Sequence, residues 1–264
     1  MTKILVILSG LLLIVPSVSA QGEIDEQQRI FYRNEQSIGL FLNSTGWGFG
    51  YRYGKRVNYL NKRLIEIDFN NIKHPKEYKT TNPYFPNTKG FVFGKKNLFV
   101  NLRGGYGFQH EMFRKIDRGG ISIRRFVTFG PSLGFYKPIY YERLYQVSQN
   151  TYRVETEKFS EDIHNPYDIY SRASFFKGFD EIKFVPGLYA KAGLTFEYSK
   201  YDRLIHSIEF GVTIDAYIKK VPIMATEENR QIFIALFVSY RFGKVIDPRT
   251  KDRNEEVQPF QDSF

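Results

Sequence analysis

Every second residue from Trp47 to Tyr53 is aromatic, and the residues between them are glycine or arginine. Side chains alternate between the two faces of a β-strand, so this segment would carry one wide apolar face and one face of bare backbone with the Arg52 side chain. A small membrane-spanning β-barrel requires both surfaces, because its outer face contacts lipid and its inner face lines a narrow polar interior. The segment therefore predicts a transmembrane barrel strand.

The same alternation recurs along the chain and predicts an all-β protein. Eight segments can be read with a period of two, and eight is the smallest common strand number for membrane barrels. Glycines gather on the polar faces, where a crowded lumen needs small residues, and aromatic residues recur near the ends of the apolar faces. A lipocalin-like soluble barrel, with the apolar face around a ligand cavity, is the alternative that this distribution argues against. The segments are 37–44, 46–53, 63–72, 97–109, 120–136, 188–199, 204–219 and 231–242.

The order of segments predicts a simple domain map. Residues 1–20 have the basic start, apolar run and small-residue cleavage site of a secretory signal peptide. A periplasmic lead-in (21–36), the eight-stranded antiparallel transmembrane barrel (37–242) and a periplasmic tail (243–264) would follow. Outer-membrane barrels have short periplasmic turns and longer outside loops, and with both termini in the periplasm the outside connections include the long segments 73–96 and 137–187.

Composition narrows the classes of function. The chain contains no cysteine, which excludes disulfides, thiol catalysis and cysteine metal sites. Its formal charge is +10, so an exported chain would meet lipopolysaccharide phosphates, anionic glycans or acidic protein partners, and nucleic acid is not an expected partner at that location.

Charged residues on the polar strand faces form the first candidate site. Five basic and five acidic side chains in so narrow an interior should pair, because an unpaired buried charge is costly. The simplest consequence is a plugged lumen, and the alternative is a narrow pore for ions or small solutes that these pairs gate. The residues are Arg52, Glu66, Asp68, Arg103, Arg124, Lys191, Glu197, Glu209, Asp215 and Arg241.

Aromatic residues in loop 137–187 form the second candidate site. They either pack into a folded cap over the barrel mouth, with added strands at 140–158, or provide a binding surface. The candidate recognition residues are Tyr140, Tyr141, Tyr145, Tyr152, Tyr167, Tyr170, Phe175 and Phe176.

Loop 73–96 differs, because it carries six lysines and a single acid, Glu77. This segment suits contact with lipopolysaccharide phosphates, or equally serves as a solubilising run. The candidate contacts are Lys73, Lys76, Lys79 and Lys89.

No motif for catalysis, metal binding or cofactor binding is present, so we predict none of the three. The four histidines fall in or beside different connections or strand ends, without metal-ligand spacing. A loop-borne hydrolase could still assemble His164 with Asp162 and Asp168, although polar residues in one long loop are more often solvated surface.

Four segments carry a family likeness: 46–55 (GWGFGYRYGK), 65–69 (IEIDF), 73–77 (KHPKE) and 82–85 (NPYF). They resemble segments of the small outer-membrane β-barrel proteins of Bacteroidetes, loosely grouped as a porin family. The resemblance implies a barrel in the outer membrane of a Gram-negative bacterium and carries over no catalytic residue. The leading hypothesis is a non-enzymatic structural or interaction protein, for example a subunit of a larger envelope complex.

Overall fold

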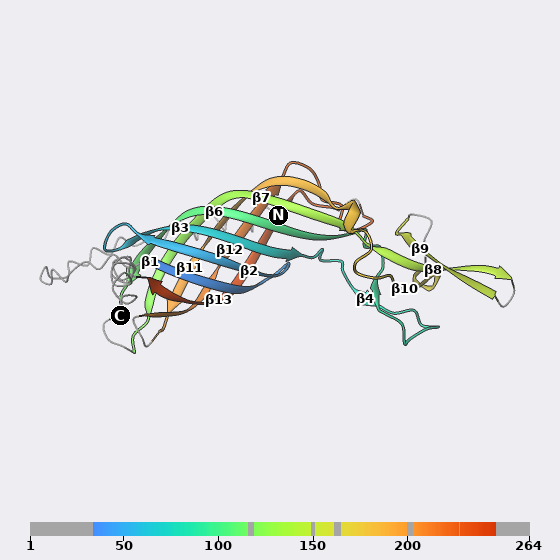
Figure 1. Cartoon of the computed structure of the whole chain (residues 1–264), viewed down its shortest axis with the longest axis horizontal. Coiled ribbons are helices and arrows are strands. Elements are labelled where there is room, and N and C mark those ends of the chain that lie inside the picture. Colours follow the sequence, from blue (N-terminus) through green and yellow to red (C-terminus); the bar gives the residue numbers. More distant parts are fainter. Residues whose placement is uncertain are drawn as a thin grey trace, which may run out of the picture. The chain divides into compact units, whose positions relative to one another are not determined.

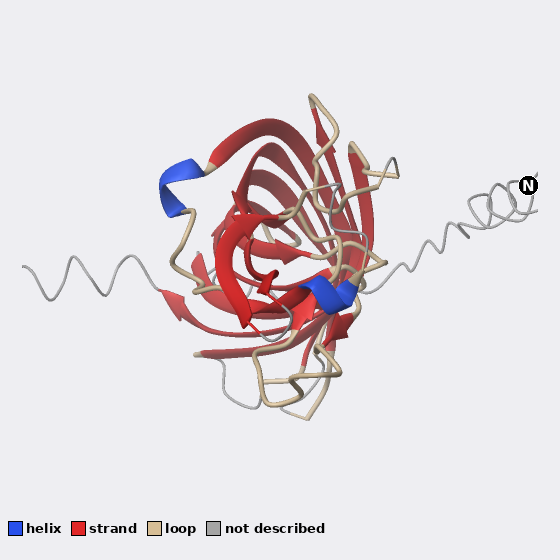
Figure 2. Cartoon of the chain, turned by 90° about the vertical axis from the view of Figure 1, so that its right-hand side faces the viewer, coloured by secondary structure: helices blue, strands red, loops and turns tan. Residues whose placement is uncertain are grey.

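A closed antiparallel barrel of eight strands forms the body of the protein (Figures 1 and 2). The computed structural model describes residues 34–115, 119–148, 151–160, 165–199, 203–226 and 228–246. β1 pairs with both β2 and β13, which closes the barrel and confirms the predicted fold. The barrel strands are β1 (Asn34–Asn43), β2 (Gly46–Arg56), β3 (Asn61–Ile72), β6 (Asn97–Phe113), β7 (Ser122–Pro138), β11 (Lys183–Glu197), β12 (Leu204–Tyr217) and β13 (Ile232–Ile246).

Side chains on these strands alternate between an exposed apolar face and a buried face. Along β13, Ile234 and Leu236 are 64% and 66% exposed, whereas Ala235 and Phe237 beside them are buried. Similar exposed apolar side chains on the other strands complete a belt around the barrel, which is the surface of strands that contact lipid. The lipocalin-like alternative is wrong, because it requires this apolar face to turn inward.

Several strands are longer than the sequence predicts. β1 begins at Asn34, inside the predicted lead-in, and β11 begins at Lys183, ahead of the predicted start at residue 188. β13 ends at Ile246 and so takes the first four residues of the predicted tail. The predicted signal peptide, the rest of the lead-in and the rest of the tail lie outside the described residues.

Connections of different length group at the two ends of the barrel. Segments 57–60, 114–121 and 198–203 join strands at the end where β1 starts and β13 stops. Segments 44–45, 73–96, 139–182 and 218–231 join strands at the opposite end, which we call the loop end. The helices in the described part of the chain are the 3-10 turns η1 (Pro166–Asp168) and η2 (Phe179–Glu181). No described helix has both the length and the apolar character to cross a membrane.

Loops 73–96 and 139–182 fold together into a structure that we call the platform. A three-stranded sheet in the order β10-β8-β9 and a two-stranded sheet of β4 and β5 form its frame. The β8–β9 hairpin extends from the loop end in Figure 1 and lies where the folded-cap alternative places added strands, at 140–158. The strands are β4 (Lys79–Thr80), β5 (Phe91–Val92), β8 (Tyr140–Ser148), β9 (Thr151–Lys158) and β10 (Ile169–Arg172).

Specific hydrogen bonds hold the two platform loops together. The Asn82 side-chain amide donates to the carbonyls of Tyr167 and Ile169 at 3.0 and 2.8 Å. The Tyr141 hydroxyl, from the other loop, donates to the carbonyls of Val92 and Lys95 at 2.8 and 2.7 Å. The platform is therefore a folded unit that the sequence alternation does not reveal.

Glycines on the inner face make room for large side chains across the lumen. A Cβ atom on Gly50 would lie 1.8 Å from Asp68 Oδ1, and one on Gly105 would lie 1.7 Å from the Tyr189 hydroxyl. Both distances are far inside van der Waals contact, so any larger residue would displace the facing side chain. This is the close approach that the predicted crowded lumen requires.

Candidate functional site

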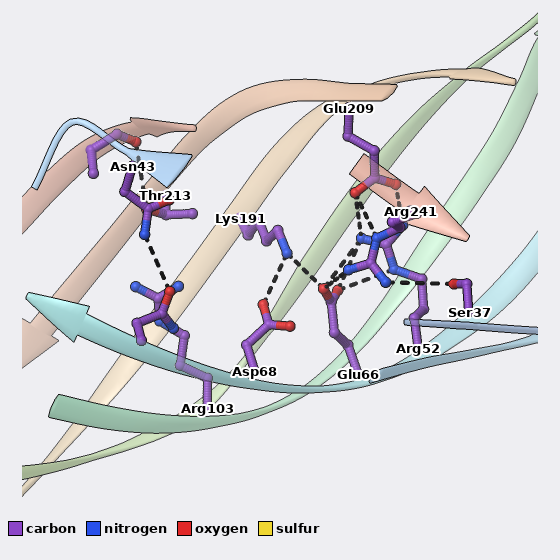
Figure 3. A network of polar contacts seen from close by, with 12 residues as sticks. Ser37, Asn43, Arg52, Glu66, Asp68, Arg103, Lys191, Glu209, Thr213 and Arg241 are labelled. Carbon is purple, nitrogen blue, oxygen red and sulfur yellow. Dashed lines mark hydrogen bonds and ion pairs between the residues drawn. The ribbon is translucent and has the colours of Figure 1, made fainter. Parts of the chain in front are cut away.

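Six charged side chains fill the middle of the barrel and form what we call the central cluster (Figure 3). Glu66 is its hub: its carboxylate accepts from Lys191 Nζ at 2.6 Å, Arg241 Nη2 at 2.6 Å and Arg52 Nη2 at 3.1 Å. The second carboxylate, Glu209, accepts from Arg52 Nη1 at 2.5 Å and Arg241 Nε at 2.8 Å. The cluster consists of Arg52, Glu66, Asp68, Lys191, Glu209 and Arg241.

The sheet register explains why these groups meet. Arg52 and Glu66 are direct cross-strand partners on β2 and β3, while Lys191 reaches Asp68 from β11 at 2.9 Å. Three cations face three carboxylates, so the cluster is neutral as a whole. The side chains of all six are at most 5% exposed, and this neutrality is what makes their burial tolerable.

A second polar group lies on the loop-end side of the central cluster. Arg103 donates to Asp215 in a two-pronged ion pair, with Nε–Oδ1 at 2.8 Å and Nη2–Oδ2 at 2.5 Å. The Asn101 amide donates to Asp215 at 3.1 Å and to the Tyr217 hydroxyl at 2.8 Å. This pair is also neutral and almost wholly buried.

An aromatic cap covers the interior at the loop end. The rings of Phe99, Tyr217 and Phe233 pack against one another with centroids 5.3 to 5.9 Å apart. Ile223 and its neighbours, from loop 218–231, pack on these rings, and the Ile223 carbonyl accepts from the Lys96 and Asn97 amides at 2.9 and 3.1 Å. The loop therefore folds into the mouth of the barrel and closes it.

A third group of charges closes the opposite end. Arg124 pairs with Glu197 and, at 3.3 Å, with Glu35, which also pairs with Lys62. A cavity of about 20 Å³ lies between this group and the central cluster. A space of that size holds about one water molecule.

All ten predicted lumen charges thus lie in the barrel interior, where they divide among three groups. The prediction missed Glu35 and Lys62. Both occupy inward-facing positions in the alternation of β1 and β3, but they fall just before the predicted starts of these strands. It also missed buried aromatic residues on the inner face: Arg52 stacks 4.5 Å from the Phe126 ring centroid, and Lys191 lies 5.2 Å from those of Phe41 and Phe237. The sequence signal that points to these rings is inner-face glycine, since Gly48, Gly193 and Gly211 lie against Phe41, Phe126 and Phe237, respectively.

The eight predicted recognition aromatics separate into structural and exposed residues. Tyr141 is fully buried and serves the fold of the platform, so it is not available for recognition. Burial also raises the pKa of its phenol well above the usual value. Tyr140, Tyr145 and Tyr170 are partly buried, whereas the most exposed side chains are Tyr152, Tyr167, Phe175 and Phe176.

The predicted lysine contacts also differ in their surroundings. Lys73 and Lys79 line a cavity between the two platform loops, and Lys89 is exposed. Lys76 forms an exposed ion pair with Glu228 at 2.7 Å. Glu77, the only acid of this segment, is bound by Lys95 and accepts the His74 amide at 2.9 Å.

The residues of the hydrolase alternative do not all fall in the described part of the chain. Asp168 ends η1, whereas His164 and Asp162 lie outside the described residues, so this alternative stays a prediction. Among the described residues, no three histidine or acidic side chains are grouped as metal ligands would be.

Comparisons with known proteins give distant likenesses. No family model and no curated protein matches the chain. Among solved structures, Ail of Yersinia pestis, in complex with the heparin analogue sucrose octasulfate, is 9% identical with a TM-score of 0.38, covering 81% of this chain and 99% of that one. Neisserial surface protein A is 9% identical with a TM-score of 0.34, covering 81% and 96%, respectively. The N-terminal β-barrel domain of Pseudomonas aeruginosa OprF is 6% identical with a TM-score of 0.35, covering 81% and 99%. Likeness at this level carries no argument about function.

Proposed function

We propose that this protein is an integral outer-membrane barrel that acts as a closed anchor and presents its platform outside the cell as an interaction surface. In this proposal it is a non-enzymatic structural or interaction protein of a Gram-negative envelope, similar in role to the small Bacteroidetes-type barrels. The filled lumen is the observation that carries the proposal.

The energetics of the lumen support an anchor over a conduit. A water path would have to separate the ion pairs of the central cluster and displace the aromatic cap. Breaking one buried ion pair costs about 3–5 kcal/mol, and the cluster contains several that share partners. Thermal fluctuation would therefore open such a path rarely, which disfavours the narrow pore.

The platform supports a role in recognition. Tyr152, Tyr167 and Phe176 are 55%, 51% and 79% exposed on a unit whose loops are held together by buried contacts. Large apolar side chains displayed on a rigid support are typical of surfaces that bind another protein. Such a surface is suited to bind another subunit of an envelope complex.

Single-channel recording in a planar bilayer tests the anchor. The purified full-length chain should give no discrete conductance steps at any voltage, while a porin inserted in the same bilayer serves as the positive control. Reproducible steps from the folded barrel would replace this proposal with the pore.

Photo-crosslinking in intact cells tests recognition. A photoreactive residue at Tyr152, on the β8–β9 hairpin, should give a discrete adduct with an envelope protein. The matched control is Tyr59, which is 51% exposed but lies at the opposite end of the barrel. No adduct from Tyr152 or Tyr167, or the same adduct from Tyr59, would contradict a platform-specific partner.

A further inference from the structure

A cavity of about 330 Å³ lies at the loop end, between the barrel wall and the two platform loops. Asn71, Leu98 and Lys137 provide its barrel side, at the loop ends of β3, β6 and β7, which are neighbours in the sheet. The residues next to them in sequence, including Ile72, Phe99 and Tyr136, are buried in the interior. Because side chains alternate along a strand, Asn71, Leu98 and Lys137 face outward. The cavity is therefore on the outer wall of the barrel and not in its lumen.

The outer wall beside this cavity is continuous with the apolar belt. Leu102 on β6 and Leu133 on β7 are direct cross-strand partners, both exposed on the same outward face as Leu98. Phe175, from the platform, lines the cavity and is 49% exposed. A molecule seated in the cavity could thus extend an apolar portion along β6 and β7 into the membrane.

The charge of the cavity is strongly positive. Its lining contains five cations, Lys73, Lys79, Lys95, Lys137 and Arg172, and one carboxylate, Glu77, which gives a net charge of +4.

Two of these cations have structural partners. Lys95 is paired with Glu77, and Lys137 Nζ donates to the carbonyls of Phe175 and Lys177 at 2.8 Å each. Within the described part of the chain, Lys73, Lys79 and Arg172 are exposed and form no ion pair, so three cations are free to bind an anion.

We propose that this cavity binds the phosphate headgroup of a lipid in the leaflet at the loop end, with the acyl chains lying along the outer face of β6 and β7. Guanidinium and ammonium groups match the charge and geometry of a phosphate monoester. The continuity with the belt selects a lipid over a soluble anion. The inference rests on the proposed function in one respect, that the barrel spans the outer membrane with the platform outside.

Lipid retention measured by native mass spectrometry tests the proposal. The full-length chain is released from nanodiscs of phosphatidylcholine doped with bisphosphorylated lipid A, or with the same lipid without its phosphates. The wild type should retain the phosphorylated lipid selectively. The variant Lys73→Gln/Lys79→Gln/Arg172→Gln should lose affinity by roughly a hundredfold to a thousandfold, since each of the three basic side chains near a phosphate contributes about one factor of five to ten.

Matched variants distinguish binding at this cavity from a general effect of positive charge at the loop end. Lys89→Gln/Lys219→Gln/Lys220→Gln removes three exposed cations of the loop end that do not line the cavity, and should change affinity less than twofold. Lys73→Arg/Lys79→Arg/Arg172→Lys keeps the charge and should keep the affinity. Heat-modifiable gel migration verifies that each variant is folded.

Three results would overturn the proposal: equal retention of the two lipids by the wild type, unchanged retention by the glutamine variant, or an equal loss in the control variant. Release of the lipid by millimolar inorganic phosphate would identify a soluble anion as the ligand instead. A barrel that is silent in the bilayer but shows no lipid preference would overturn this inference and leave the proposed function standing.

Discussion

Replacing Glu66 by glutamine removes the hub of the central cluster without changing its size. Glu66 contacts Lys191, Arg241 and Arg52 at 2.6, 2.6 and 3.1 Å. In the variant, these three cations face only two carboxylates, Asp68 and Glu209. The interior would then hold one uncompensated positive charge, which is the most costly outcome of breaking a buried ion pair.

The expected loss is about 3–5 kcal/mol in the free energy of unfolding. At 1.36 kcal/mol per factor of ten, the ratio of folded to unfolded chains falls by roughly 10² to 10⁴. With a denaturant slope of about 2 kcal/mol per molar, the urea midpoint should fall by roughly 1.5–2.5 M.

Urea titration of the barrel in lipid vesicles measures this change. Trp47, the only tryptophan of the chain, lies on the outer face and reports the transition by its fluorescence. The matched control is Glu228→Gln, which breaks the exposed ion pair with Lys76 and should leave the midpoint unchanged.

A double variant tests whether charge imbalance in the central cluster causes the loss of stability. Glu66→Gln with Arg241→Gln leaves two neutral pairs, Arg52 with Glu209 at 2.5 Å and Lys191 with Asp68 at 2.9 Å. Its loss of stability should be smaller than the sum of the two single losses by about 1–3 kcal/mol. A loss below about 1 kcal/mol in Glu66→Gln itself would refute the reasoning, because it would mean that water screens the cluster.

Three further predictions concern the packing of the lumen and the platform. Gly105→Ala places a Cβ atom 1.7 Å from the Tyr189 hydroxyl and should destabilise the barrel by about 1–3 kcal/mol in the same urea titration, whereas Gly104→Ala, with nothing within 4 Å, should not. Tyr141→Phe removes a hydroxyl that donates to two carbonyls, so hydrogen exchange in loop 73–96 should speed up by roughly tenfold, while replacing an exposed platform tyrosine should leave it unchanged. Hydrogen bonds from Lys158 and Tyr140 hold the pKa of Glu181 below its usual value. Its contribution to the platform is therefore present above the usual glutamate value of 4.5 and is lost as pH falls through the lowered pKa, and a carboxyl NMR titration with a midpoint at or above 4.5 would contradict this.

The strand alternation predicted the barrel because lipid and lumen impose opposite requirements on successive residues. Successive residues of every barrel strand face lipid and lumen in alternation, so the pattern can be read in each strand without any tertiary information. It also separated Glu66 and Asp68 from Ile65 and Ile67 correctly, since the acids are buried inside and the isoleucines are exposed on the belt.

The partners of each charge were not predictable from the same pattern. Arg52 meets Glu209, 157 residues further along the chain, only because strand tilt and register bring β2 opposite β12 across the lumen. The inward aromatic residues were missed for a related reason: Phe126 and Tyr189 have the inward parity of their strands, but a large ring fits a narrow lumen only where a small residue lies beside it, and the alternation does not tell which positions meet. The β8–β9 hairpin falls where the folded-cap alternative places added strands, but the rest of the platform escaped prediction. Its other strands, β4, β5 and β10, are short, and its order depends on contacts between loops, such as Asn82 with Tyr167.

Cysteine scanning of β13 tests the filled barrel most directly, because the native chain has no cysteine to interfere. Single cysteines are introduced at Phe237 and Ser239, which face inward, and at Leu236 and Val238, which face outward, in the barrel reconstituted in vesicles. A water-soluble thiol reagent should label none of the four, and a lipid-soluble reagent should label only the outward pair. Rapid labelling of Ser239→Cys by the water-soluble reagent would show a hydrated lumen and contradict the closed anchor.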